Sequence, residues 1–291
     1  MARTTDRLPE NAPGDYFVDT SCIDCDTCRF VAPDVFGRSD RADKSFVRRQ
    51  PSTPAERRRA AMALVSCPTS SIGTARKEDV ALAARAFPEP IAPSVYYCGY
   101  ASESSFGASS YLLTRPGGNV LVDSPRAARP LFDAIRALGG ARWMFLTHRD
   151  DVADHALFHK ELGCERILHA ADVSSGTRDV ERTIEGREPV VLADDLLAIP
   201  LPGHTRGSMA LLHADTHLFT GDHLAHDEQD DRLQAWQDVC WYSWEEQMRS
   251  MERLLNHRFT WILPGHGRRY QAPSAEVMRA RLQDLIGRMR A

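Results

Sequence analysis

The residues with the clearest chemical pattern are four cysteines near the start of the chain. Cys22, Cys25 and Cys28 form a C-x₂-C-x₂-C run, and Cys67 is followed at once by Pro68. Three thiolates at this spacing can bind one cubane iron–sulfur cluster, and a remote Cys-Pro can supply the fourth ligand. The alternative is a structural zinc site made by the same four thiolates. We favour the cluster, because zinc sites usually combine one C-x₂-C with a second close pair.

This cysteine-containing segment, residues 15–76, resembles single-cluster bacterial ferredoxins. In two-cluster ferredoxins another Cys-Pro follows the third cysteine after three residues, but here that place is taken by Ala32 and Pro33. The sequence therefore predicts one [4Fe-4S] cluster. Residues 53–56 (Thr-Pro-Ala-Glu) form a capping box with proline at the first helical position, which predicts a helix that ends at Cys67. We expect a ferredoxin-like domain at residues 1–78.

A second set of side chains could bind a metal. His148, His204, Asp222 and His266 each come just after a predicted strand, and three of the four lie beside a glycine. Loops at the ends of strands are where a rigid sheet positions reactive side chains. Imidazole nitrogen and carboxylate oxygen are ligands that zinc and iron accept. The sequence therefore predicts a metal site built from four separate loops.

The elements that must position these residues alternate between strands and helices from about residue 95. We expect strands at 109–113, 119–123, 142–147, 196–201, 209–213, 216–220 and 259–263, and helices at 130–138, 151–162, 244–255 and 274–288. Three prolines between residues 88 and 93 indicate a linker at 79–94. The remaining residues, 95–291, form the predicted metal-binding domain.

From about residue 95 to 270 the chain resembles the metallo-β-lactamase superfamily, and its motifs are those of the glyoxalase II-type branch. The likeness rests on Thr147-His148 and on residues 202–207 (Pro-Gly-His-Thr-Arg-Gly), 219–223 (Phe-Thr-Gly-Asp-His) and 263–266 (Leu-Pro-Gly-His). It implies an α+β protein whose body is an αββα sandwich with a metal centre between two sheets. By this resemblance His148 and His204 hold a first metal, His266 a second, and Asp222 bridges them.

The first motif departs from the superfamily pattern His-x-His-x-Asp-His. Asp150 stands in the place of the second histidine. Asp151 and His155 are four residues apart at a predicted helix start, so we expect them to share a face and to act as the Asp-His pair; Asp154 is a weaker candidate. An aspartate at this place is also a common N-cap. The site is thus predicted to hold one or two zinc or iron ions.

Two kinds of enzyme and one regulatory protein fit these motifs. The first is a metal-dependent hydrolase of esters, thioesters or lactones, in which Asp151 or Asp222 orients or deprotonates the metal-bound water. The second is a non-haem iron oxidoreductase for dioxygen, nitric oxide or persulfides that takes electrons from the cluster. The third is a redox-responsive regulatory protein. The superfamily favours the hydrolase, and the fused cluster favours the oxidoreductase. We expect the hydrolase, with the oxidoreductase and the regulatory protein as alternatives.

Composition limits the partners without naming a function. The 291 residues carry a net charge of −4, which gives no electrostatic reason to expect binding to nucleic acid or to a membrane surface. We expect a small-molecule substrate and a redox partner protein. The seven cysteines do not resemble a secreted disulfide framework, and the chain start has no apolar segment, so a cytoplasmic protein is predicted.

Overall fold

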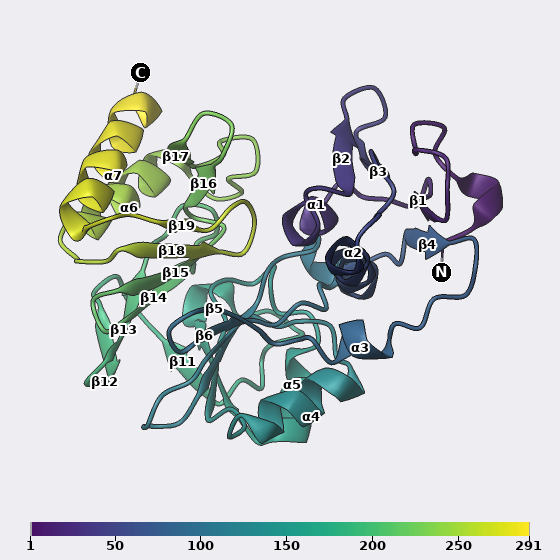
Figure 1. Ribbon diagram of the computed structural model, residues 1–291. Coiled ribbons are helices and arrows are strands. Elements are labelled where there is room, and N and C mark those ends of the chain that lie inside the picture. Colours follow the sequence, from purple (N-terminus) through teal and green to yellow (C-terminus); the bar gives the residue numbers. More distant parts are fainter. Residues whose placement is uncertain (1, 291) are drawn as a thin grey trace.

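The computed structural model describes residues 2–290 and has a small N-terminal region beside a larger body (Figure 1). Four short strands in two antiparallel pairs, together with two helices, enclose the cysteines of the N-terminal region. The elements are β1 (Tyr16–Val18) paired with β4 (Ile72–Thr74), β2 (Phe36–Ser39) paired with β3 (Lys44–Val47), α1 (Thr27–Val31) and α2 (Pro54–Ser66).

Helix α2 begins as the sequence predicts. The side chain of Thr53 accepts a hydrogen bond from the backbone of Glu56, and the Glu56 carboxylate accepts one from the backbone of Thr53, both at 3.2 Å. This capping box satisfies two backbone N–H groups that the first turn leaves free. The helix ends at Ser66, and its buried face carries Met62 against the core. Cys67 therefore directly follows a helix that is held at its start by the capping box and along its length by core packing.

The body opens with a seven-stranded mixed sheet in the order β11-β10-β9-β8-β7-β6-β5. Its strands are β5 (Glu89–Ala92), β6 (Val95–Tyr97), β7 (Tyr111–Leu113), β8 (Val120–Val122), β9 (Trp143–Phe145), β10 (Glu165–His169) and β11 (Arg182–Ile184). The strands from β8 to β11 are parallel, and the helices α4 (Arg129–Ala137) and α5 (His155–Leu162) connect them on the outer face (Figure 1).

A six-stranded sheet in the order β12-β13-β14-β15-β18-β19 forms the other half of the body. Its strands are β12 (Val190–Ala193), β13 (Leu196–Pro200), β14 (Met209–His213), β15 (His217–Gly221), β18 (Trp261–Pro264) and β19 (Tyr270–Gln271). The helices α6 (Trp244–Leu254) and α7 (Ala275–Met289) cover its outer face, where Leu218 and Ile262 of the sheet share a buried cluster with Met251 and Leu282 (Figure 1). The predicted αββα sandwich in an α+β protein is therefore confirmed.

Smaller elements complete the fold. The ribbon of β16 (Ala225–Asp227) and β17 (Arg232–Gln234) follows the second sheet, and three short 3₁₀ turns are η1 (Thr4–Asp6), η2 (Glu103–Ser105) and η3 (Ala170–Asp172). Within the predicted linker 79–94, the chain forms α3 (Ala81–Ala84) and the edge strand β5. The boundaries 1–78, 79–94 and 95–291 stay a prediction.

The two sheets are joined at the ends of their strands. The Tyr111 hydroxyl of β7 donates to the carbonyl of Pro264 in β18 (2.7 Å), and its ring lies 5.6 Å from that of Phe219. The backbone N–H of Met209 donates to the carbonyl of Thr147 (2.8 Å). These contacts fix the two sheets where the candidate ligands leave their strands.

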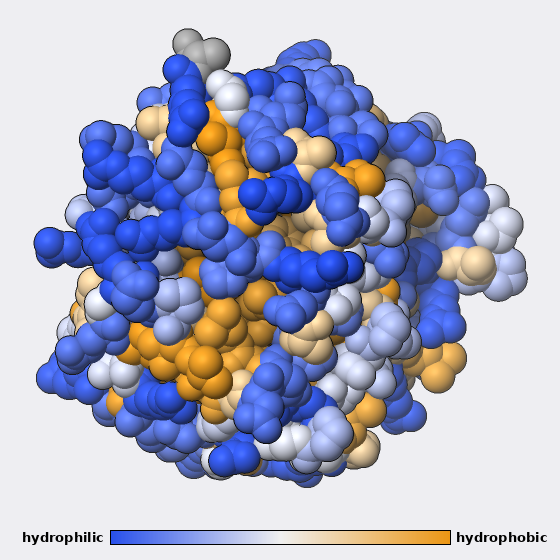
Figure 2. Space-filling model, turned by 90° about the vertical axis from the view of Figure 1, so that its left-hand side faces the viewer, coloured by the Kyte–Doolittle hydropathy of each residue, from blue (hydrophilic) through white to orange (hydrophobic). Residues whose placement is uncertain are grey.

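The face of the body on the left of Figure 1 carries a patch of hydrophobic residues within a largely hydrophilic surface (Figure 2). β12 is the edge strand on this side, and its Val191 is 69% exposed. The N-terminal region lies on the opposite side of the molecule in Figure 1, away from this patch. Over residues 2–290, every helix is too short or too polar to span a bilayer.

Candidate metal centre

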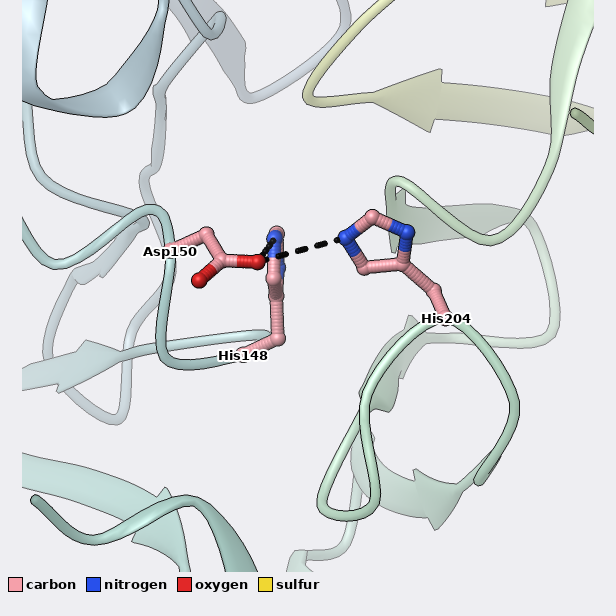
Figure 3. Close-up of side chains that lie close together, drawn as sticks. All are labelled: His148, Asp150 and His204. Atoms are coloured by element: carbon pink, nitrogen blue, oxygen red, sulfur yellow. Dashed lines mark ion pairs between the residues drawn. The ribbon is translucent and has the colours of Figure 1, made fainter. Parts of the chain in front are cut away.

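Three of the predicted ligands meet between the two sheets. His148 follows β9, Asp150 lies two residues later in the same loop, and His204 follows β13. The Asp150 carboxylate points toward both rings, with Oδ2 at 3.9 Å from His148 Nε2 and 3.5 Å from His204 Nε2 (Figure 3). Two imidazole nitrogens and a carboxylate oxygen at these distances can bind one metal ion.

Two further carboxylates adjoin this group. Asp222 follows β15, and its Oδ2 lies 3.6 Å from His148 Nε2 and 3.7 Å from His204 Nε2. Asp151 forms a second metal-capable group with His148 and Asp222. A Cβ atom at Gly265 would lie 2.6 Å from Asp151 Oδ2 and 2.8 Å from Asp222 Oδ1. The glycine of the Pro-Gly-His segment is thus needed for the two carboxylates to approach.

The atoms that converge here lack other partners. Across the described residues 2–290, no hydrogen bond reaches these buried atoms: Nε2 of His148 and His204, Oδ2 of Asp150, and both carboxylate oxygens of Asp151. A buried polar atom left unpaired costs about 1–3 kcal/mol, so such atoms normally have a ligand or a partner. The donor set of imidazole and carboxylate fits zinc or iron. The residues present therefore fit the predicted metal ion.

The carboxylates at the centre shift one another's pKa values. Burial, together with the negative charge of Asp222, raises the pKa of Asp151 well above its usual range. Burial also acts to raise the pKa of Asp222, but the adjacent His266 and His148 outweigh it and hold that pKa below its usual range. A bound cation would remove the repulsion between Asp151 and Asp222 and favour the ionised form of both.

The ring of His148 is held in an orientation suited to a ligand. The Thr147 hydroxyl donates to the carboxylate of Asp123 (2.9 Å) and lies 3.0 Å from His148 Nδ1. This arrangement favours a proton on Nδ1, which leaves the lone pair of Nε2 facing Asp150 and Asp222. Burial lowers the pKa of His148 to about 4, so the ring is neutral at pH 7, as metal binding requires.

His266 lies beside these groups and contacts Asp222. Its Nδ1 is 2.8 Å and 2.9 Å from the two Asp222 oxygens, and its backbone N–H donates to Asp222 Oδ1 at 3.1 Å. Its Nε2 is 3.4 Å from the carbonyl of Phe106. Burial acts to lower the pKa of His266, but Asp222 outweighs it and raises that pKa. His266 is therefore paired with the carboxylate predicted to bridge the metals.

The structure does not bring His155 to this centre. Its Nε2 lies 3.2 Å from the carbonyl of Gly176, and its Nδ1 lies 3.1 Å from a guanidinium nitrogen of the buried Arg166. The expectation that Asp151 and His155 share a helical face is wrong, because α5 begins only at His155 and Ala153 has a left-handed φ of 27°. Asp151 belongs to the preceding loop.

Asp154 has a structural role. Its carboxylate accepts a hydrogen bond from the backbone N–H of Ala127 at 2.7 Å and so ties the start of α5 to the segment before α4. It makes no side-chain cap hydrogen bond to its own helix.

Three residues of the site are absent from the sequence prediction. Asp172 joins two ligand loops, because its carboxylate accepts from the backbone N–H groups of Arg149 (3.0 Å) and Gly207 (2.8 Å). Asp123 holds Thr147, and burial raises its pKa to about 8. The third, His223, is fully buried next to Asp222 in the chain. Asp123 could have been found, since it follows a buried strand as the ligands do; Asp172 belongs to no motif.

The four cysteines of the N-terminal region gather around α1 and α2. All are free thiols; Cys22, Cys28 and Cys67 are buried, and Cys25 is partly exposed. Backbone N–H groups point at two of the sulfurs, from Asp24 to Cys22 Sγ (3.5 Å) and from Ser71 to Cys67 Sγ (3.3 Å). N–H donors to sulfur are typical of cluster sites. The four residues therefore fit the predicted cluster.

The cysteine loop is shaped by two aspartates in left-handed conformation. Asp24 has φ 58° and Asp26 has φ 68°, and Arg29 binds both carboxylates at 2.6 Å and 2.5 Å. Burial raises the pKa of Cys25 to about 11 and raises that of Cys28 further. Buried thiols that resist ionisation need a strongly bound cation to form thiolates, which iron supplies.

One cavity joins the two sites. It has a volume of about 1020 Å³, and its walls include the cysteine loop, the metal-capable residues and the segment before β7. The lining residues that belong to the two candidate sites or to the segment between them are Cys25, Phe106, Asp150, Asp151, His204, Asp222 and His266. Other parts of the wall are apolar and carry Trp236, Val239 and Trp241. The cysteine loop therefore forms part of the candidate active site.

Known proteins match the two regions separately. Residues 18–74 match the family model described as the 4Fe-4S single cluster domain of Ferredoxin I. The fold of the body resembles solved metallo-β-lactamases at a TM-score of 0.51: DIM-1 (14% identity, 67% of this chain and 95% of that chain) and VMB-1 (16%, 67% and 95%). BLEG-1, a B3 metallo-β-lactamase, has the same TM-score (13% identity, 68% of this chain and 100% of that chain).

The chain joins a 4Fe-4S ferredoxin-type domain to a metallo-β-lactamase fold. The resemblance of the N-terminal region to single-cluster ferredoxins is confirmed, and so is the fold implied by the resemblance of the body to metallo-β-lactamases; the glyoxalase II-type branch stays a prediction. A search of curated protein sequences found no match. Identities of 13–16% show the fold of the body and leave the reaction open.

Proposed function

We propose that this protein is a metal-dependent oxidoreductase in which the ferredoxin-type domain supplies electrons to a metal centre in the metallo-β-lactamase fold. The observation that carries the proposal is the shared cavity, because Cys25 of the cluster loop and the candidate ligands Asp150, Asp222 and His204 line the same space. A structural cluster would need no such contact with the active site. A hydrolase would have no use for electrons delivered there.

The residues of the body have defined roles in this proposal. His148, Asp150 and His204 hold the first metal ion, Asp151 and His266 are the candidate ligands of a second, and Asp222 lies between the two sets. The carboxylate at position 150 makes the donor set richer in oxygen than the superfamily motif, which favours iron over zinc. Iron supplies one-electron chemistry that zinc lacks, and a [4Fe-4S] cluster exchanges electrons one at a time.

The cavity supports a small organic substrate or co-substrate. Its volume of about 1020 Å³ is at the upper end of ligand pockets. Trp236, Val239 and Trp241 offer apolar surface, and the Trp241 ring lies 6.2 Å from that of His204. With one metal ion bound, Asp151 is free to accept a proton next to the metal ligands. Dioxygen, nitric oxide or a persulfide fits as the species that is reduced or oxidised.

A metallo-hydrolase is the second candidate. Asp151 favours it, since both of its carboxylate oxygens lack hydrogen-bond partners among the described residues and could deprotonate a water molecule. In this case the metal would be zinc, and the cluster would be structural or would sense redox state.

Metal and sulfide analysis of anaerobically purified protein, with spectra before and after dithionite, separates the two. For the oxidoreductase we expect a [4Fe-4S] cluster, further iron in the body, and consumption of dioxygen, nitric oxide or persulfide that requires an electron donor. Zinc in the body, with ester or lactone cleavage that is unchanged by dithionite, would overturn it.

A further inference from the structure

A short piece of backbone, Phe106-Gly107, lies between the cysteine loop and the metal centre and contacts both. Gly107 packs directly on Cys25: a Cβ atom at position 107 would lie 2.6 Å from Cys25 Cβ and 2.8 Å from Cys25 Sγ. No other residue type fits this contact without moving the loop, and the φ of Gly107 is +86°. The glycine therefore brings the backbone against a predicted cluster ligand.

Thr27 stabilises the contact between Gly107 and Cys25. Its hydroxyl donates to the carbonyl of Gly107 (3.2 Å) and lies 3.3 Å from Cys25 Sγ. Thr27 is buried, so water does not compete for these contacts. One side chain thus holds both the sulfur and the backbone of the next segment.

The other end of the segment reaches the metal centre. The carbonyl of Phe106 lies 3.4 Å from Nε2 of His266, whose Nδ1 is 2.8 Å from Asp222. Phe106 has a left-handed φ of 48°, and the residue is 55% exposed although its carbonyl lies beside His266. A small pocket lined by Cys25, Gly107 and His266 lies beside this chain of contacts.

We propose that Phe106-Gly107 is the route by which electrons pass between Cys25 and His266. The inference rests on the proposed function and adds the path to it. Each transfer moves one electron: the cluster is oxidised by one electron, and iron in the body is reduced from ferric to ferrous. An external one-electron donor, a reduced ferredoxin or flavoprotein, restores the cluster.

A second connection between the two regions is an ion pair that serves as the comparison. Arg268, two residues after His266, binds Asp26 of the cysteine loop at 2.8 Å and also Glu228 at 3.0 Å. This ion pair joins the domains but makes no contact with a cysteine sulfur. It should hold the domains together without carrying electrons.

The test measures electron transfer inside the protein loaded with cluster and ferric iron. A limiting amount of photoreduced deazaflavin first bleaches the cluster absorption. The absorption then recovers as the ferric signal is lost in electron paramagnetic resonance, and the recovery gives the transfer rate. Protein with zinc in the body should show no recovery. No recovery in the iron-loaded wild type would reject the proposed function itself.

Two variants address the route. Thr27→Val keeps the shape of the side chain but removes the hydrogen bond to Gly107, and we expect the recovery to become several-fold slower with unchanged cluster and iron content. Gly107→Ala should slow it further. Arg268→Gln is the matched control and should leave the rate unchanged. Equal rates in the wild type and Thr27→Val, or a loss confined to Arg268→Gln, would overturn the route while the proposed function still stands.

Discussion

The two candidate metal-binding regions of this protein are built in different ways. Three of the four cysteines lie between residues 22 and 28, in a loop and the first turn of α1, and the fourth directly follows α2. The body instead gathers its candidate ligands from four loops, between residues 148 and 266, at the strand ends of two sheets. Local spacing therefore specifies the candidate cluster site, whereas the residues of the candidate metal centre come together only once the sheets have packed.

The largest effect should come from Asp222, which lies at the middle of the centre. We expect Asp222→Asn to lower the metal affinity of the body by at least about 100-fold, because it removes a candidate ligand and the partner of His266. Cluster content should not change, since the cysteine site is local. Metal titration and acid-labile sulfide would measure the two separately.

Asp227→Asn is the matched control for Asp222. Asp227 lines the same cavity but belongs to neither metal-capable group. Its replacement should leave the affinity near that of the wild type. Equal losses in both variants would mean that the cavity's total charge, and not a ligand, controls metal binding.

A substitution at Gly265 tests whether close packing between the two sheets is needed to form the candidate metal centre. In Gly265→Ala the added Cβ would lie against Asp151 and Asp222, so we expect a loss of about 1–3 kcal/mol in the free energy of unfolding and weaker metal binding. Gly287→Ala in α7 meets nothing within 4 Å and should instead stabilise the protein by about 0.5–1 kcal/mol. Urea unfolding of both variants gives the comparison; equal signs would contradict it.

Replacing His155 tests whether this residue is a metal ligand, as the sequence motif predicts, or a structural residue, as its contacts indicate. His155→Ala removes a partner of the buried Arg166, and we expect a loss of about 1–2 kcal/mol in the free energy of unfolding with unchanged metal affinity. His159→Ala, on the same helix but more exposed, should cost less. A loss of metal from His155→Ala would show that this histidine is a ligand after all.

The smallest expected effect on stability comes from the ion pair between Glu181 and Arg166, the arginine that contacts His155. Burial acts to raise the pKa of Glu181, but Arg166 outweighs it and lowers that pKa to about 2. Ionised Glu181 therefore stabilises the fold above its unfolded-state pKa of about 4.3, and this stabilisation is lost as the pH falls toward 2.

The Glu181 side chain is 30% exposed, so solvent screening limits the effect. Glu181→Gln should cost about 1 kcal/mol at pH 7 and progressively less between about pH 4 and pH 2. Urea unfolding at several pH values would show it. The exposed Glu185→Gln should show no such trend, and a difference that grows toward acid pH would refute the assignment.

The fold and the cysteine site could be predicted because their signals are local. Apolar patterns predicted the strands and helices of the body, the resemblance to metallo-β-lactamases implied the sandwich, and the Thr53–Glu56 capping box predicted the start of α2. The loop after β9 could not be predicted in the same way. Two aspartates before a helix suit both a ligand and an N-cap, and only the turn at Ala153 decides that Asp151 faces Asp222 while His155 faces Arg166.

Asp172 shows a second limit of sequence reasoning. Its carboxylate holds the loop of Arg149 and the loop of Gly207 together, but it lies more than twenty residues from either. A contact of this kind depends on the order of the strands in space. Neither residue type nor spacing along the chain predicts this contact.

The position of the ligands along the chain has a consequence for biosynthesis. All four cysteines precede residue 68, whereas His266 and Gly265 belong to the last tenth of the sequence. Because the N-terminal region of a chain generally folds first during synthesis, we expect the cysteine site to form before the candidate metal centre. A maturation factor could therefore load the two inorganic groups in a fixed order, with the cluster inserted first.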